Sequence, residues 1–193
     1  MRLSVVTLGH VHAEDLVALT KHFEHIEQLV LDVAPRDPLD AHRAELNRAI
    51  DAATADWILI LREREVIDDP LALEIVRAAG AGTAWGFRIR AIPWYAGKPL
   101  RIGRDDGELR LVHRRHLLRR GELAVQGTVV RLESMLRSVT FASADEHRRH
   151  LAEKARAQSA LRRAMTFARY ALGTRAFDAN TLRYLWIEAG YAS

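Results

Sequence analysis

Three short apolar runs in the first third of the chain constrain the fold more than any other feature. They occupy residues 3–8, 29–31 and 57–61. Each run is short enough to be a buried strand, and a helical pattern of apolar residues follows each one. Strands that alternate with helices in this way form a parallel sheet with right-handed crossovers. The sequence therefore predicts an α/β fold with a Rossmann-like, mostly parallel central sheet flanked by helices.

Capping residues and apolar stripes indicate where these helices lie. The helix after the first run carries its apolar stripe from Leu16 to Ile26. Asp37, which precedes a proline, is the expected N-cap of the second helix. An Asp-Asp-Pro sequence at residues 68–70 starts the third helix, which is expected to stop near Gly80.

After Gly80 the pattern changes to alternation. Residues 85–91 and 109–111 alternate apolar with polar side chains, which predicts two half-buried strands. Residues 93–99, between them, predict an ordered loop because they contain two prolines and a glycine.

The last part of the chain reads as helical. A pattern from Asp145 to Leu172 places many arginines beside an apolar stripe, and a short helix is expected at residues 178–188. We therefore predict one domain over residues 1–144 and a helical extension over residues 145–193 packed on it. A homodimer contact, or contact of the arginine-rich helix with an anionic membrane, stays open as an alternative.

Composition limits the class of protein. The 193 residues contain no cysteine, which excludes disulfides and thiolate metal sites. The start of the chain lacks the pattern of a secretory signal, so a cytoplasmic location is expected, with peripheral membrane contact left open. The formal charge of +4 favours anionic partners. Nucleic acid is not expected among them, because arginines and acids are mixed along the chain.

The candidate site follows from the predicted sheet. Ligands of open parallel sheets bind beyond the carboxyl ends of the strands, so the segments after residues 8, 31 and 61 should lie together. Asp32 ends a buried strand, where it could bind the ribose or base of a ligand or simply cap the structure. The alternating His10 and His12 lack a third ligand nearby, so no metal site is predicted.

Over residues 1–160 the order of segments resembles glycosyltransferase family 2, especially the branch of bacterial lipopolysaccharide-core glucosyltransferases. Three weaker similarities are LSVVTLGHVHAEDL, VLDVAPRD and LNRAIDAATADWILIL. The more specific similarities are FRIRAIPWYAGKPLR and the ELRLVHRR that follows it. The resemblance implies a GT-A-like fold, a nucleotide-sugar donor, expected to be UDP-linked, and a polysaccharide or lipid-linked acceptor.

The resemblance also implies roles for particular residues. For nucleotide binding it points to Asp32, Asp37, Asn47, Arg62 and Arg64. For the acceptor it points to Trp94, Tyr95 and Arg110.

The departures from this family matter more than the matches. Arg62 and Arg64 stand where the family carries an Asp-x-Asp metal motif, and a guanidinium has no lone pair for a metal. No cofactor is therefore expected, although either arginine could neutralise a diphosphate. The His-Glu pair of the family is absent near residues 125–127. Asp106 and Glu65 are then the carboxylates that could act as a general base.

Two functions follow from this reading. The chain could be a metal-independent glycosyltransferase. It could equally be a non-catalytic descendant that binds a nucleotide sugar, a glycan or a protein partner. In the second case, the two arginines pair with the acidic residues around them.

Overall fold

The computed structural model describes residues 1–11, 13–33, 42–100, 106–118, 123–154 and 178–188. The chain forms two compact units. The first comprises residues 1–91 and 105–137, and the second comprises residues 92–104 and 138–193. The units therefore interleave along the chain, in contrast to the predicted single division after residue 144.

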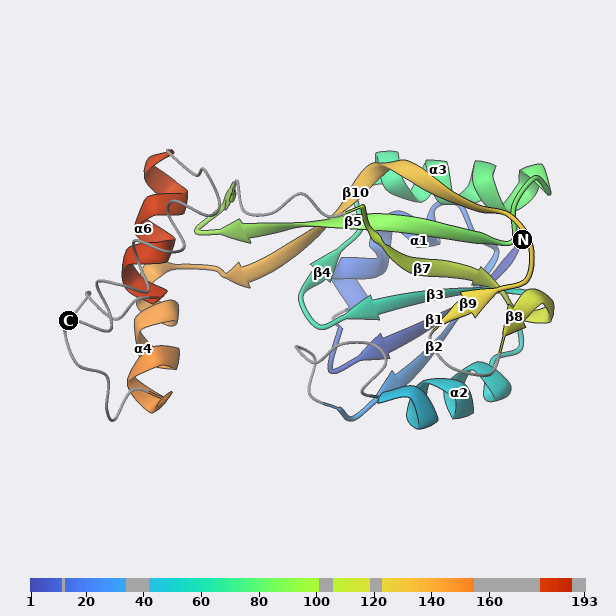
Figure 1. Ribbon diagram of the computed structural model, residues 1–193, viewed down its shortest axis with the longest axis horizontal. Coiled ribbons are helices and arrows are strands. Elements are labelled where there is room, and N and C mark those ends of the chain that lie inside the picture. Colours follow the sequence, from blue (N-terminus) through green and yellow to red (C-terminus); the bar gives the residue numbers. More distant parts are fainter. Residues whose placement is uncertain (12, 34–41, 101–105, 119–122, 155–177, 189–193) are drawn as a thin grey trace. The chain divides into compact units, whose positions relative to one another are not determined.

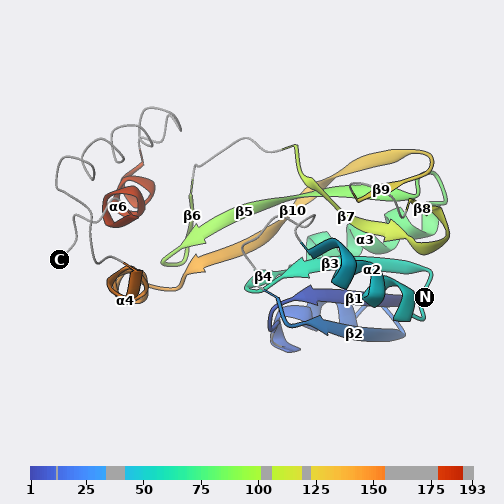
Figure 2. The same cartoon turned by 60° about the horizontal axis from the view of Figure 1, so that its bottom comes forward.

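Three parallel strands form the first part of the sheet, as the apolar runs predict. They are β1 (Arg2–Leu8), β2 (His25–Leu31) and β3 (Trp57–Arg62). β1 lies between the other two, and its Val5 pairs with Gln28 on one side and Leu59 on the other. Figure 2 shows the three strands side by side. Every residue of β3 except Arg62 is buried, which explains its uninterrupted apolar sequence.

Beyond β3 the sheet becomes mixed. β7 (Glu108–His113) is antiparallel to β3 and to β5 (Gly86–Tyr95). The full order is β2-β1-β3-β7-β5-β10-β4, where β10 is Val129–Phe141 and β4 is Glu65–Val66. The prediction of a parallel sheet thus holds for β1, β2 and β3, and the whole is a mixed α/β sheet flanked by helices.

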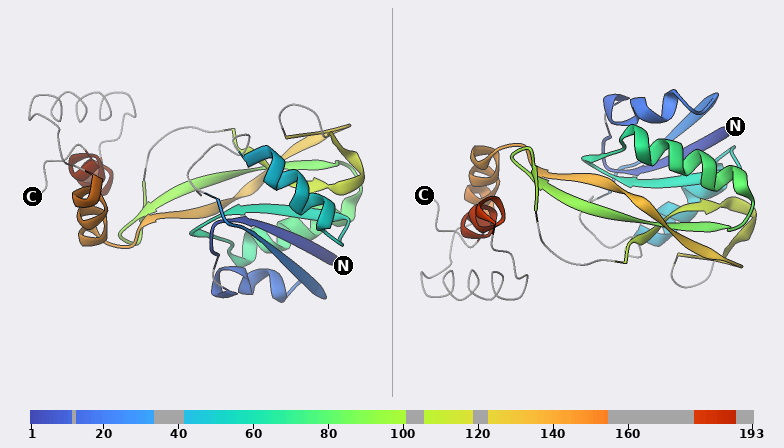
Figure 3. Two further views of the ribbon diagram at one scale, coloured as in Figure 1. Left: turned by 90° about the horizontal axis from the view of Figure 1, so that it is seen from below. Right: turned by 90° about the horizontal axis from the view of Figure 1, so that it is seen from above.

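Helices cover both faces of this sheet in the first unit. The 3-10 turn η1 (Ala13–Leu16), α1 (Val17–Thr20) and α3 (Asp69–Ala81) pack on one face, around Leu59. α2 (Arg43–Ala52) packs on the other face, around Ile60. The two views of Figure 3 show α2 in front of the strands in one and α3 in front in the other.

The start of α3 follows the prediction. The Asp68 carboxylate accepts a hydrogen bond from the Leu71 N–H at 3.0 Å, and Pro70 occupies the first turn. The helix ends at Gly82, whose φ of 65° is the left-handed conformation that favours glycine.

Two predictions about secondary structure were wrong, and one long strand was not predicted. The first helix ends at Thr20, and Ile26 lies in β2. The predicted loop at residues 93–99 is the end of β5 joined to β6 (Lys98–Pro99) by a tight turn. Ala96 and Gly97 in this turn both have positive φ, as hairpin turns require. β10 was missed altogether.

The second unit has its own small core. Tyr95 and Phe141 are buried there with residues of α4 (Ala144–Lys154) and α6 (Ala179–Glu188). Figure 1 shows these helices in orange and red. His147 stacks on Phe141 at 4.3 Å between ring centroids and meets the edge of Tyr95 at 5.6 Å. The helix expected at residues 178–188 is confirmed by α6, while the predicted continuation from 155 to 172 lies outside the described residues.

An aromatic cluster lies at the opposite end of β3 from Arg62. His113, the last residue of β7, meets the edges of Trp57 and Trp85 at 5.0 and 5.2 Å between ring centroids. The 3-10 turn η3 (Arg114–His116) follows, and His116 stacks on Trp85 at 3.9 Å. Beyond it, β8 (Leu117–Leu118) and β9 (Ala124–Val125) form a short ladder.

This cluster predicts a loss of stability in acid. Burial lowers the pKa of His113, and the nearby cations Arg114 and Arg115 act in the same direction, although Asp56 opposes them. A lowered pKa means that the folded state binds this proton less well than the unfolded state does. Stability should therefore be complete above pH 6.5, the ordinary pKa, and fall as the pH drops below it.

The measurement is urea unfolding at about pH 8 and about pH 5.5, on either side of the ordinary histidine pKa. The change with pH should become smaller in His113→Phe, which keeps an aromatic ring against both tryptophans and cannot be protonated. An equal change with pH in the wild type and in this variant would contradict the assignment to His113.

Candidate functional site

The carboxyl ends of the parallel strands β1, β2 and β3 lie along one edge of the sheet, and the order of the strands changes direction at β1. The chain passes from β1 to β2 on one side and then returns to β3 on the other, so a crevice is expected between β1 and β3. Leu8 pairs with both Leu31 and Arg62. Past the strands, the Gly9 N–H donates to the Leu31 carbonyl at 2.9 Å and the Glu63 N–H to the Leu8 carbonyl at 2.8 Å. The three segments predicted to meet therefore do so.

A network of four charged side chains lies at the carboxyl end of β3. It comprises Arg62, Glu65, Glu108 and Arg110, and we call it the ion-pair network. Glu108 is its centre: one carboxylate oxygen lies 2.8 Å from the guanidinium of Arg62 and 2.8 Å from that of Arg110. Its other oxygen accepts a hydrogen bond from Arg62 at 3.0 Å.

The second half of the ion-pair network is buried. Arg110 donates to both carboxylate oxygens of Glu65, at 2.9 and 3.2 Å, and their side chains are 1% and 2% exposed. Glu65 also accepts the Arg62 N–H at 2.7 Å. A buried carboxylate is tolerated when it is paired and hydrogen-bonded in this way. Glu65 therefore holds β3, β4 and β7 together, and its burial leaves it no room to meet a substrate.

The two arginines that replace the metal motif occupy different surroundings. Arg62 is at the crevice, where its side chain is 20% exposed and tied to Glu108. Arg64 is exposed in the turn between β3 and β4, with a φ of 63° that non-glycine residues rarely adopt. Arg62 is thus fixed by a carboxylate of the ion-pair network.

The remaining predicted nucleotide contacts are partly described. Asp32 is exposed and lines an open hollow of about 420 Å³ with Glu45 and Arg48 of α2. Asn47, also on α2, has its Oδ1 enclosed without a hydrogen-bond partner among the described residues. Asp37 lies outside the described residues.

The three predicted acceptor contacts are divided between the units. Trp94 is half-buried and Tyr95 is fully buried in the second unit, where burial raises the pKa of the Tyr95 phenol. Arg110 is buried in the ion-pair network of the first unit. Tyr95 and Arg110 are thus engaged in packing and pairing, whereas Asp106 is almost completely exposed before β7.

Glu108 is the residue that the sequence analysis missed. It lies two positions before Arg110 in β7, and the two side chains meet at 2.8 Å, although a β-bulge in the register with β5 falls between them. That spacing could have indicated the pair. The contact with Arg62 could not be predicted in the same way, because 46 positions separate the two residues.

Within the described part of the chain, no three histidine, aspartate or glutamate side chains are grouped to hold a metal ion. No described helix combines the length and the apolar character needed to cross a membrane. Comparison with protein-family models finds no matching family, and comparison with curated proteins finds no relative.

Proposed function

We propose that this chain is a non-catalytic descendant of the glycosyltransferase family 2 type, which binds a nucleotide sugar at the crevice between β1 and β3 without a metal. The observation that carries the proposal is the ion-pair network. The network occupies the end of β3, where the resemblance implies a metal. It joins the guanidiniums of Arg62 and Arg110 to carboxylates. The absence of cysteine suits the reducing cytoplasm that the proposal assumes.

Two features favour binding over transfer. Sugar transfer with inversion needs a general base that can reach the acceptor hydroxyl. Glu65 is enclosed with both oxygens occupied, and Asp106 is a nearly fully exposed carboxylate paired only loosely with Arg131, at 3.7 Å. Neither is held as a positioned base. Arg62, by contrast, has an exposed fraction that a diphosphate could reach.

The proposal predicts weak binding of UDP-glucose that does not depend on metal. Arg62 must leave Glu108 to meet a diphosphate, so we expect a Kd of about 0.1–1 mM. Calorimetry with and without Mn²⁺ should give the same value. Arg62→Ala should weaken binding about tenfold, because it removes one charge-assisted hydrogen bond. Glu108→Gln should strengthen binding, because it releases the Arg62 guanidinium from its carboxylate.

The matched control is Arg115→Ala, an exposed arginine with a single ion pair to Asp56 at 3.5 Å. This variant should bind UDP-glucose as the wild type does. Binding that requires Mn²⁺ would contradict the proposal, and so would the same affinity in all variants. Release of UDP in the presence of an acceptor glycan would show a transferase instead.

A further inference from the structure

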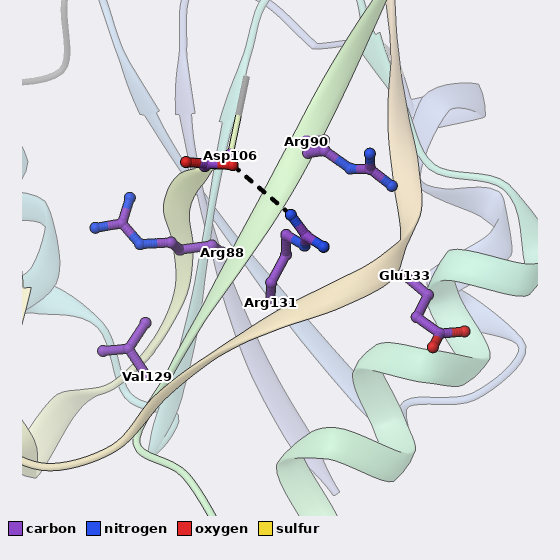
Figure 4. A pocket seen from close by; sticks show the side chains of 6 residues that line it. All are labelled: Arg88, Arg90, Asp106, Val129, Arg131 and Glu133. Carbon is purple, nitrogen blue, oxygen red and sulfur yellow. Dashed lines mark ion pairs between the residues drawn. The ribbon is translucent and has the colours of Figure 1, made fainter. Parts of the chain in front are cut away.

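A second hollow lies on the outer face of β5 and β10, within the first unit. Its volume is about 920 Å³, and Figure 4 shows its lining: Arg88, Arg90, Asp106, Val129, Arg131 and Glu133. Alternate residues of a strand point to the same face, which explains how Arg88 and Arg90 of β5 meet Val129, Arg131 and Glu133 of β10. We call it the arginine hollow.

The arginine hollow and the ion-pair network share no residue. Ile89 of β5 pairs with Glu108 of the network, whereas the lining residue Arg88 pairs with Leu109. A ligand bound in the hollow would therefore be independent of a nucleotide at the crevice.

The positive charges of the hollow are only partly neutralised. Among the described residues, Arg131 pairs with Asp106 at 3.7 Å, and the two side chains are 54% and 99% exposed, so solvent screens this contact strongly. The Nε of Arg90 is shielded from solvent and has no hydrogen-bond partner among the described residues. A shielded donor without a partner is costly, and a bound anion would satisfy it.

One side of the hollow is fixed by the backbone. Arg88 donates to the Gly107 carbonyl at 3.0 Å. Gly107 lies against β5, where an added Cβ would be 3.0 Å from the carbonyl carbon of Ile89, and its φ is +85°. Glycine is therefore needed for this close approach, and it holds both Arg88 and the neighbouring Asp106 at the rim.

We propose that the arginine hollow binds an anionic saccharide, a sugar that carries phosphate or carboxylate groups. Guanidiniums form paired hydrogen bonds with both kinds of group, and their spread across an open hollow suits a ligand larger than a single ion. The carboxylates of Asp106 and Glu133 accept hydrogen bonds from sugar hydroxyls. None of the described lining residues is aromatic, so they offer no stacking surface for a nucleobase.

The test is a titration of the whole chain with glucose 6-phosphate and with glucuronate, followed by amide chemical shifts. Glucose and inorganic phosphate are titrated as the two halves of the ligand. We expect saturable binding of both anionic sugars with a Kd of about 1–10 mM, and weaker binding of both halves. Arg90→Gln and Arg131→Gln should each weaken binding about tenfold, as loss of a charge-assisted contact does. Arg115→Gln, at an exposed arginine of η3 that does not line the hollow, should leave the affinity unchanged.

Failure to saturate with either anionic sugar would overturn the proposal, as would equal weakening in Arg115→Gln. Inorganic phosphate that binds as tightly as glucose 6-phosphate would also overturn it, because the site would then recognise only a simple anion. UDP titrations of the same variants separate this site from the crevice. Arg90→Gln and Arg131→Gln should give the same result as the wild type when titrated with UDP.

Discussion

Replacing Arg110 with methionine is expected to lower the free energy of unfolding by about 3–5 kcal/mol, the usual cost of removing one partner from a buried ion pair. Arg110 is 1% exposed and binds both oxygens of Glu65. Without it, a carboxylate stays buried, with the Arg62 N–H as its remaining hydrogen-bond donor from this network. Methionine fills much of the same volume, so the loss should come from the unpaired charge and not from a cavity.

Urea unfolding of three variants separates this explanation from others. In Glu65→Gln combined with Arg110→Met, the buried charge is gone and the amide oxygen still accepts the Arg62 N–H, so about half of the loss should be recovered. Arg131→Met, which changes an exposed arginine of the neighbouring part of the sheet, should cost less than about 0.5 kcal/mol. A loss below about 1 kcal/mol in Arg110→Met would show that water reaches Glu65 and that the pair is not structurally important.

Under the proposed descent from a metal-dependent transferase, the same network would allow the metal to be lost without loss of the fold. Carboxylates that bind a metal repel each other when the metal is absent, whereas Arg62 and Arg110 neutralise Glu65 and Glu108 permanently. The end of β3 then becomes a structural element. This is the physical basis for preferring a binding function over transfer.

The first half of the fold could be predicted because its signals are local. One face of β1 and β3 is buried by η1, α1 and α3, and the other by α2, which lies between the two strands in the chain, so the patterns and their partners lie close together. α3 carries its own start and stop signals in Asp68 and Gly82. Such features do not depend on distant residues, which is why sequence patterns identify them well.

The second half depends on long-range pairing. β10 has a buried residue only at Leu132, Leu136 and Phe141, so its burial pattern matches neither strand alternation nor a helical stripe. Its position is fixed by Glu74 of α3, whose carboxylate accepts the backbone N–H groups of Glu133 and Ser134, each at 2.8 Å. A contact across some 60 positions leaves no local trace. Prediction of the site from the sequence was limited for the same reason, because Arg62 and Glu108 meet only in the folded sheet.

A second large effect is expected at Gly127, within the segment where the resemblance implies a catalytic His-Glu pair. Gly127 has a φ of +111°, outside the region that other residues tolerate, and an added Cβ would lie 2.7 Å from the Cδ1 of Trp85. We expect Gly127→Ala to lower the free energy of unfolding by about 2–4 kcal/mol, from backbone strain and overpacking together. The control is Gly82→Ala, where φ is +65° and nothing lies within 4 Å, so only about 1 kcal/mol should be lost.

A double-mutant cycle with Trp85→Leu divides this loss into its two causes. The smaller side chain removes the clash but leaves the backbone strain, so Gly127→Ala should cost less in that background by about 1–2 kcal/mol. The Trp85 ring stacks on His116 at 3.9 Å between ring centroids, and the backbone N–H of Trp85 donates to the Thr128 carbonyl at 2.9 Å. If the free-energy losses of the two substitutions simply add, the Trp85 ring moves aside to make room for the methyl group introduced by Gly127→Ala. If the two free-energy losses are coupled, packing against Trp85 fixes this segment. The fold then requires glycine at a position near which a transferase would need a base.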